Sequence, residues 1–239
     1  MSCIHWSNGR KGGVGKSLLS WLLTEYALKH LKAPFCLVET DRVNPDVGRL
    51  YKETVRTEFA YFSESEQKRT KADKIFNLAC QSTVIVNLIV NLPAQVHEPM
   101  KMWFLEDEIY ELAKEEGVSF CNWYVSNGGY DSIGLFMKTL KDLGQFMPHV
   151  LVRNWGLCDD WTHVDEDDEL QALVRQYRVP VIDIPKFPYA ERNFIEANQL
   201  TLTEALSHPK LSLVSKKRVH KFLRQSFAAI ESTGLLVDE

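Results

Sequence analysis

The residues best suited to chemistry form a glycine-rich loop near the start of the chain. Its sequence is Lys11-Gly12-Gly13-Val14-Gly15-Lys16-Ser17. The loop follows an apolar segment, residues 4–7, and precedes a segment of helical character, residues 17–30. A strand, a glycine-rich loop and a helix in this order are the setting that a phosphate-binding loop requires. Glycines let backbone N–H groups turn toward a polyphosphate, and the helix N-terminus adds its dipole, so we predict a phosphate site here.

Two side chains of the loop have predicted roles of their own. Lys16 is predicted to reach the β- and γ-phosphates of a nucleotide, and the Ser17 hydroxyl to ligate Mg²⁺. Arg10 occupies the position at which the strict G-x-x-x-x-G-K-[ST] pattern has its first glycine, so the motif is a variant. A glycine-rich turn with an accidental lysine is the alternative. The predicted nucleotide contacts in this segment are Gly12, Gly13, Val14, Gly15, Lys16, Ser17 and Leu18.

Lys11 links the loop to a known family. With a lysine in this place the loop resembles the deviant Walker A motif, KGGxxGK[ST], of the ParA/MinD superfamily. The resemblance implies a P-loop ATPase that binds ATP and Mg²⁺ and forms an ATP-dependent homodimer, in which Lys11 crosses to the partner's nucleotide. A second cation stabilises charge on the transferring phosphates only when two subunits meet. An ordinary solvated lysine is the alternative for Lys11.

The end of the second predicted strand, residues 35–39, and the residues after it read Glu39-Thr40-Asp41-Arg42-Val43-Asn44. This run resembles the D-x-D-P-V-N sequence of TraL-type conjugation and mobilisation proteins, with Glu39 and Arg42 as departures. The resemblance assigns Asp41 to the first switch, where it would position the attacking water and help to organise Mg²⁺. The alternative is an acid without a special role, because such residues are common at the carboxyl ends of strands in α/β proteins.

The segment around Asn91 departs from the family at a critical place. It resembles the D-x-P-A-G second switch, but Asn91 replaces the Walker B aspartate and Gln95 replaces the glycine. An asparagine accepts a hydrogen bond without the strength that an ionised acceptor gives. We therefore expect weak Mg²⁺ binding or slow hydrolysis. The sequence leaves open whether another acid, such as Glu39, compensates.

Two further residues are assigned to the base by the resemblance. The predicted strand at residues 150–154 ends in Asn154, where the family has an asparagine that reads the adenine edge. Its amide offers both a donor and an acceptor, as the adenine edge requires. Pro185 follows the predicted strand at residues 179–184 and corresponds to the loop that lines the base pocket. An ordinary turn residue is the alternative for Asn154.

Strand-like and helical segments alternate along the chain and must position these residues. This alternation predicts an α/β fold with a doubly wound, mostly parallel sheet flanked by helices, in one P-loop ATPase domain, 1–239. The predicted strands are residues 4–7, 35–39, 83–91, 119–125, 150–154 and 179–184. Residues 52–80 are polar and helical in character, and the other predicted helices are residues 17–30, 102–116, 133–143, 166–177 and 215–232.

The composition excludes several classes of protein. The chain has 239 residues, is 45% hydrophobic and has a net charge of -4, which excludes disordered and collagen-like chains. The slight acidity also argues against a protein that coats nucleic acid throughout. Five scattered cysteines without a C-x-x-C pair favour a reduced, cytoplasmic protein without structural zinc. The first residues do not resemble a signal peptide, and the longest apolar run is too short for a bilayer.

Predicted partners rest on the last helical segment. Its cationic stripe would contact DNA non-specifically, as in ParA-type partition ATPases, and a solvated helix face is the alternative. The final residues are too few and too acidic for a membrane-targeting tail, so no membrane contact is expected. Residues 97–110 are a candidate partner or dimer surface, or an ordinary core-facing helix. The stripe consists of Lys216, Lys217, Arg218, Lys221 and Arg224.

The leading functional hypothesis is a switch that dimerises on ATP and Mg²⁺, hydrolyses ATP slowly and serves plasmid mobilisation, conjugal transfer or partition. A second hypothesis is an ATP-binding module without useful turnover that presents a surface to a relaxase or another transfer-system protein. A third is a phosphotransferase or a maturation ATPase on the same fold.

Overall fold

The structure is a computed structural model that describes residues 2–81 and 87–238. Its strands are β1 Ser2–Asn8, β2 Phe35–Glu39, β3 Thr57–Phe59, β4 Asn87–Asn91, β5 Val118–Ser126, β6 His149–Asn154 and β7 Val181–Ile184. Within the described residues these seven strands form one parallel sheet in the order β3-β2-β4-β1-β5-β6-β7. β1 therefore lies at the centre, between β4 and β5, and the predicted doubly wound parallel fold is confirmed.

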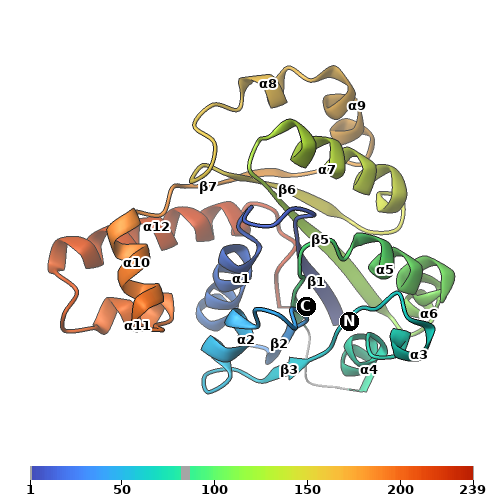
Figure 1. Ribbon diagram of the computed structural model, residues 1–239, viewed down its shortest axis with the longest axis horizontal. Coiled ribbons are helices and arrows are strands. Elements are labelled where there is room, and N and C mark those ends of the chain that lie inside the picture. The colour runs from blue at the N-terminus through green and yellow to red at the C-terminus, as the bar shows by residue number, and fades with distance from the viewer. Residues whose placement is uncertain (1, 82–86, 239) are drawn as a thin grey trace.

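Helices cover both faces of this sheet (Figure 1). In that view α10, α11 and the start of α12 lie to the left, α3 to α6 lie at the lower right, and α7 to α9 lie above. The helix bounds are α1 Lys16–His30, α2 Asp46–Tyr51, α3 Glu66–Arg69, α4 Asp73–Gln81, α5 His97–Lys101, the π-helix η1 Met102–Glu106, α6 Ile109–Glu115, α7 Tyr130–Leu143, α8 Thr162–Asp165, α9 Asp168–Gln176, α10 Tyr189–Ala197, α11 Leu202–Ser207 and α12 Leu213–Glu231.

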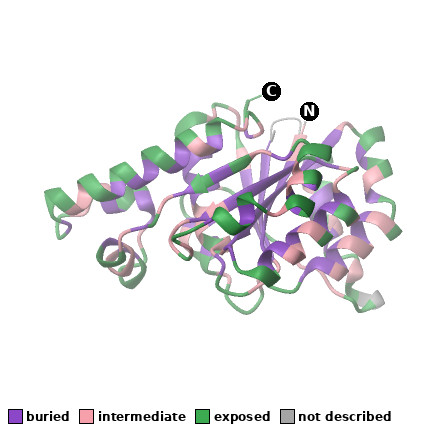
Figure 2. Cartoon of the chain, turned by 90° about the horizontal axis from the view of Figure 1, so that it is seen from above, coloured by how far each residue is buried: buried purple, intermediate pink, exposed green. Residues whose placement is uncertain are grey.

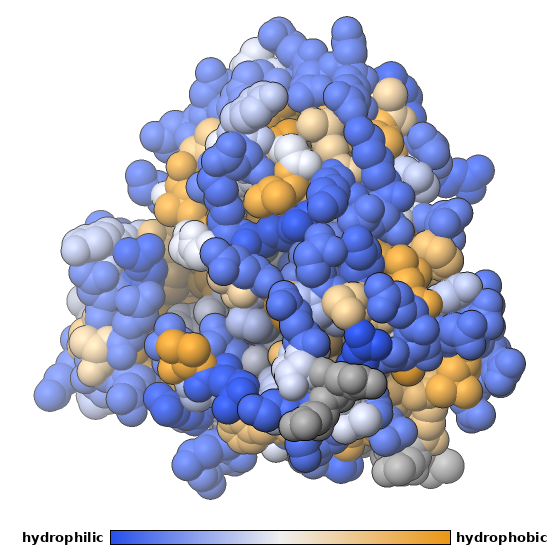
Figure 3. Space-filling view, turned by 45° about the vertical axis from the view of Figure 1, so that its right-hand side comes forward, coloured by the Kyte–Doolittle hydropathy of each residue, from blue (hydrophilic) through white to orange (hydrophobic). Residues whose placement is uncertain are grey.

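Successive side chains of the strands enter cores on opposite faces of the sheet, as strand geometry requires. On β2, Leu37 joins the core under α1 and α12, whereas Cys36 and Val38 join the core under α4 and α6. Figure 2 shows the consequence, with buried strands at the centre and exposed residues on the outer faces of the helices. The face in Figure 3 is mostly hydrophilic, and its hydrophobic residues gather in small separate groups.

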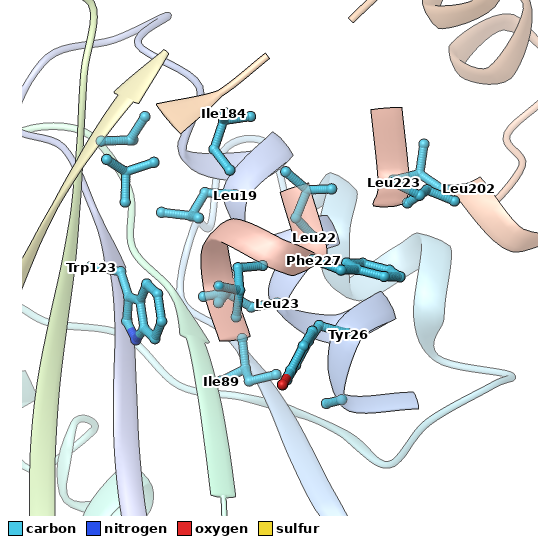
Figure 4. Packing of buried hydrophobic residues seen from close by; sticks show 14 of the residues in the cluster. Leu19, Leu22, Leu23, Tyr26, Ile89, Trp123, Ile184, Leu202, Leu223 and Phe227 are labelled. Atoms are coloured by element: carbon cyan, nitrogen blue, oxygen red, sulfur yellow. The ribbon is translucent and has the colours of Figure 1, made fainter. Parts of the chain in front are cut away.

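The helix that follows the glycine-rich loop is anchored on both sides. Leu19, Leu22, Leu23 and Tyr26 of α1 are buried, and Figure 4 shows them near strand side chains and α12. The ring of Tyr26 meets Phe227 of α12 edge to face at 5.8 Å between centroids. The start of α1 is thereby fixed relative to the sheet, which fixes the loop before it.

The structure also differs from the sequence-based expectations. β3 lies inside residues 52–80, which we expected to be helical, and it was missed because three residues are too few for a period-2 pattern. The expected helix at 102–116 is interrupted, because η1 ends at Glu106 and Glu108 has a φ of 56°. The prediction for residues 83–86 as strand lies outside the described residues, and β4 is described from Asn87.

Several other local expectations have clear outcomes. Met100, Trp103 and Phe104 are buried, so the apolar residues of the 97–110 segment pack in the core. The predicted helix at residues 166–177 is present as α9, and its N-cap is Asp167, whose carboxylate accepts a hydrogen bond from Leu170 N. Across the described parts of the chain, we find no helix with both the length and the apolar character that crossing a membrane requires.

His149 provides a test of this core. Its side chain is 1% exposed, and in the described structure neither ring nitrogen has a hydrogen-bond partner. Burial lowers the pKa of His149 from 6.5 to about 4. The unfolded chain then binds the proton more readily, so stability is lost as the pH falls from 6.5 toward 4. We expect a loss of about 2–3 kcal/mol between pH 7 and pH 4.5 from this group.

Urea unfolding at the two pH values measures this loss. A His149→Leu variant should lose less stability on acidification than the unmodified chain, by that amount. Gln225→Leu, at an exposed position of α12, removes no titratable group and is the control, so it should leave the pH dependence unchanged. An equal pH dependence in His149→Leu and the unmodified chain would contradict the prediction.

Candidate functional site

The glycine-rich loop leaves the carboxyl end of β1 and turns into α1. Gly13 and Gly15 have φ values of 74° and 111°, in the left-handed region where a Cβ is strained. At Gly15 a Cβ would also lie 2.6 Å from the amide nitrogen of Asn154. Glycine is therefore required at both positions, and the predicted strand–loop–helix arrangement is present.

Hydrogen bonds from three elements hold the loop in shape. Ser7 Oγ on β1 donates to the carbonyl of Lys16 at 2.9 Å. Asn154 Nδ2 at the end of β6 donates to the carbonyl of Val14, also at 2.9 Å. Lys16 Nζ donates across the loop to the carbonyl of Lys11 at 2.8 Å. The Lys16 side chain is thus folded back over the loop, and its ammonium is bonded to the loop backbone.

A cleft of about 1030 Å³ opens in front of the loop. Gly12, Gly13, Gly15, Lys16, Ser17 and Leu18 line it from the loop and α1. Val14 also belongs to the loop, but its side chain packs in the core and does not line the cleft. The other elements contribute Trp21, Asp41, Asn44, Asp46, Arg49, Leu50, Leu92, Ala94, Asn154, Gly156, Leu157, Lys186, Phe187, Tyr189, Arg192, Ile195, Glu196, Gln199 and Leu200.

Asp41 shares this cleft with Lys16 and Ser17. Burial lowers the pKa of the Lys16 ammonium, and the nearby Asp41 carboxylate acts against that shift. Asp41 Oδ1 accepts hydrogen bonds from Val43 N and Asn44 N, both at 2.9 Å, so it closes the turn of its own loop. The cleft therefore combines a lysine ammonium, a hydroxyl and a carboxylate, which suits a phosphate and its cation.

Glu39 and Asn91 lie behind Asp41 and are both buried. Asn91 Nδ2 donates to Glu39 Oε1 at 2.9 Å, and Asn91 Oδ1 accepts from Ser20 Oγ at 2.9 Å. Burial raises the pKa of the Glu39 carboxyl, and hydrogen bonds from Asp41 N, Gly48 N and Asn91 oppose the rise. Asn91 is thus engaged with its neighbours and does not line the cleft.

Lys11 points away from the cleft. Its ammonium forms an ion pair with Asp131 at the start of α7, at 2.5 Å. Both side chains are substantially exposed, so the pair contributes about 1 kcal/mol at most. The structure therefore holds Lys11 on the surface of its own chain by a contact that is weak enough to exchange.

The two predicted base contacts are placed differently. The amide of Asn154 lines the cleft, and its oxygen also accepts from Gly156 N at 3.0 Å. Pro185 is not among the cleft residues, although its neighbours Lys186 and Phe187 are. Contact of either residue with a base stays a prediction.

The segment after β4, which we expected to be a second switch, contacts the loop through Arg10. Gln95 N donates to the carbonyl of Arg10 at 3.3 Å. The Arg10 guanidinium lies 3.7 Å from the carboxylate of Glu98 on α5. Hydrogen bonds from Lys101 and Lys138 to that carboxylate lower the pKa of Glu98 to about 2. Arg10 therefore links the loop to α5 by direct contacts.

Several residues of the site were not identified from the sequence. Asp131 was not identified, because only the packing of α7 against β5 brings it to Lys11. Tyr189 and Arg192 lie on α10, in a segment for which we predicted no helix. Pro188 before Tyr189 is a helix-start signal that would have located α10.

Comparison with known proteins places this site in context. No protein-family model matches the chain. Among solved structures, the MinC:MinD cell division protein complex of Aquifex aeolicus aligns with a TM-score of 0.55 at 12% identity, over 100% of this chain and 98% of that one. A ParA family ATPase from Chlorobium tepidum aligns with a TM-score of 0.50 at 13% identity, over 93% and 98%. The fold is that of the ParA and MinD ATPases.

Sequence relatives agree with the resemblance seen around Asp41. The chain is 22% identical to a TraL protein of Escherichia coli over 246 aligned positions, which cover 99% of this chain and 100% of that protein. It is 40% identical to MobD of Acidithiobacillus ferrooxidans over 63 residues, or 26% of this chain. The MobD match spans 27% of that protein. The predicted resemblance to ParA/MinD and TraL-type proteins is confirmed.

The backbone conformation of Gln95, in the segment after β4, can be tested by substitution. Its φ of 60° is in the left-handed region, where a residue with a Cβ is strained and glycine is not. We expect Gln95→Gly to raise the free energy of unfolding by about 0.5–1 kcal/mol, measured by urea unfolding. Gln225→Gly in the middle of α12 is the control and should lower it by about 1 kcal/mol. A loss of stability in Gln95→Gly would contradict the left-handed backbone conformation of Gln95.

Proposed function

We propose that the chain is an ATP-binding molecular switch that dimerises when ATP and Mg²⁺ are bound and hydrolyses ATP slowly. The observation that supports this most strongly is the glycine-rich loop itself. It presents backbone, Lys16 and Ser17 to a cleft that Asp41 also lines, on the fold of the ParA and MinD ATPases. The proposed unit is the single domain of residues 1–239, and ATP is available to it in the cytoplasm.

Each site residue has a role in this proposal. The loop N–H groups and Lys16 hold the phosphates, with Lys16 exchanging its contact on the Lys11 carbonyl for the ligand. Ser17 and Asp41 supply a hydroxyl and a carboxylate, the oxygen donors that Mg²⁺ prefers, and so fit that ion. Bound Mg²⁺ supplies neutralisation of charge on the phosphates. Asp41 orients the attacking water, and Asn154 meets the adenine edge with Pro185 nearby.

Lys11 acts in trans in the proposed dimer. Its ammonium leaves Asp131 and reaches the nucleotide of the second copy, where it stabilises charge on the transferring phosphates. The exchange is feasible because the Lys11–Asp131 pair is exposed and contributes little.

A specific observation supports a second candidate, an ATP-binding interaction module without useful turnover. The Asn91 amide is engaged by Ser20 and Glu39, so the second switch offers no side-chain charge to the cleft. In both candidates the full-length match to TraL and the partial match to MobD favour a role in plasmid mobilisation, conjugal transfer or partition, with a relaxase or transfer-system protein as partner.

The proposed DNA contact uses α12, which extends beyond the sheet (Figure 1). Lys217, Lys221 and Arg224 are exposed and lie on one side of the helix. Arg218 instead bonds the buried carboxylate of Glu191 at 3.0 Å, and Lys216 is partly buried. Of the five basic residues in the predicted stripe, three therefore carry the proposal.

Light scattering tests the proposed switch. The mass should double only with ATP and Mg²⁺, because the trans lysine then has a ligand, and Lys11→Ala should remain a monomer.

Lys16→Ala should weaken ATP binding about 10- to 150-fold, the effect of a lost charge-assisted hydrogen bond. Lys71→Ala, an exposed lysine far from the loop, is the control for both measurements.

The possible outcomes separate the candidates. ATP binding and dimerisation with turnover below background would favour the interaction module. An ATP affinity unchanged by Lys16→Ala would contradict both candidates.

DNA binding is tested by charge removal on α12. Replacing Lys217, Lys221 and Arg224 by Gln should reduce the slope of log K against log salt by about 3, since each phosphate contact contributes about 0.9. Fluorescence anisotropy with duplex DNA of unrelated sequences measures the slope. Gln at Lys52, Lys71 and Lys114 removes the same charge elsewhere and should leave it unchanged. Equal slopes in the two triple variants would contradict a DNA contact on α12.

A further inference from the structure

Glu39 is the last residue of β2, and its side chain is 1% exposed. Its carboxylate accepts hydrogen bonds from Asn91 Nδ2 at 2.9 Å, Asp41 N at 2.9 Å and Gly48 N at 3.0 Å. These three donors are an amide side chain and two backbone N–H groups, none of which carries a formal charge. The carboxylate is therefore held in the protein interior by dipoles.

The two backbone donors lie at the two ends of one loop. Oε1 accepts from Asp41, at the start of the loop, and Oε2 accepts from Gly48, in the helix α2 that follows it. Between them lie residues that line the cleft, Asn44 and Asp46. One carboxylate thus closes the segment 41–48 at both ends and sets the position of Asp41.

Gly48 makes this contact possible. A Cβ at Gly48 would lie 2.8 Å from Cβ of Glu39, closer than such atoms approach in proteins, and 3.1 Å from its Cγ, which is also tight. The φ of Gly48 is ordinary for a helix, so the requirement for glycine comes from the close approach of Glu39 and not from backbone strain.

Asn91 completes the arrangement from the next strand. β2 and β4 are paired in a register that sets Glu39 opposite Asn91. The Asn91 amide donates to Glu39 and accepts from Ser20 on α1, which uses both ends of the amide. An aspartate at this position would have only acceptors and would place a second carboxylate against Glu39 in a buried site. Two like charges at this distance repel strongly.

We infer that Glu39 and Asn91 are a matched pair, in which Glu39 is the positioning residue for the loop that carries Asp41 and the neutral Asn91 is the partner that this carboxylate requires. The inference rests on the proposed nucleotide site for its consequence. The carboxylate expected at the end of β4 is present one strand away, at the end of β2. Asn91 is therefore matched to its neighbour and is not simply a lost acid.

A double-mutant cycle tests the pair without nucleotide. The variants are Glu39→Gln, Asn91→Asp and the two combined. Glu39→Gln places its amide NH2 group against a backbone N–H whichever way the amide is turned, and Asn91→Asp sets one carboxylate against another. Each single change should therefore lower the urea midpoint. In the combined variant one carboxylate again faces one amide across the two strands, and the repulsion between two carboxylates is absent, although the new amide NH2 group also faces Asp41 N. The folding equilibrium constant of the combined variant should exceed the value expected from the two single changes by about tenfold.

Trypsin cleavage after Arg42 reports on the loop itself. Arg42 is exposed in the segment that Glu39 closes, so Glu39→Gln should speed cleavage there relative to cleavage after Lys210, between α11 and α12. Asp142→Asn is the control. Asp142 is a partly buried carboxylate that pairs with His97 of α5 and has no hydrogen bond to residues 41–48 or to the segment around Lys210 in the described structure, so its loss should leave the cleavage ratio unchanged.

Binding of a fluorescent ATP analogue with Mg²⁺ connects the pair to the proposed site. Affinity should fall about tenfold in Glu39→Gln, as expected when a hydrogen-bonded charge is lost. It should stay low in the combined variant, because an amide in place of the Glu39 carboxylate cannot accept from both Asp41 N and Gly48 N. Additive single effects in the cycle, or an unchanged cleavage ratio in Glu39→Gln, would overturn the inference. A failure of the unmodified chain to bind ATP would overturn the proposed function instead, because the urea and trypsin measurements contain no nucleotide.

Discussion

Parallel pairing of β1 with β4 and β5 is the constraint on which the site depends. In a parallel sheet the carboxyl ends of the strands meet at one edge, and ligands bind in the crevice outside that edge. β1 leads into the glycine-rich loop, β2 into the Asp41 segment and β4 into the Gln95 segment, and β6 ends at Asn154. The pairing brings together groups that are more than one hundred residues apart in the sequence.

The polar groups at this edge are connected to one another, which limits how each can move. Asn154 holds the loop through the carbonyl of Val14, Arg10 connects the loop to α5, and Glu39 connects Asp41 to Asn91. Buried polar groups without partners are costly, so such a network favours one arrangement over near alternatives. In contrast, Lys11 and Asp131 meet on the surface, where an ion pair exchanges readily.

The cleft is connected to the other end of the molecule through buried contacts of α1. Glu25 on α1 accepts hydrogen bonds from Tyr51 of α2 and from Thr203 of α11, and α11 packs against α12. α2 follows the Asp41 loop, and α12 carries the exposed basic residues. A chain of direct contacts therefore exists between the cleft proposed for a nucleotide and the surface proposed for DNA.

The sequence alone determined the fold class and the phosphate loop, because alternating strand and helix patterns and the requirement for glycine at positive φ are local properties. It also located Asp41, Asn91 and Asn154 at strand ends. The interruption after η1, the strand β3 and the helices α10 and α11 were not predicted, since their segments are short or lack a clear period. Only the tertiary structure decided the partners: Asp131 for Lys11, Glu191 for Arg218 and Glu39 for Asn91. These pairings depend on strand register and helix packing, which join residues that no spacing in the sequence relates.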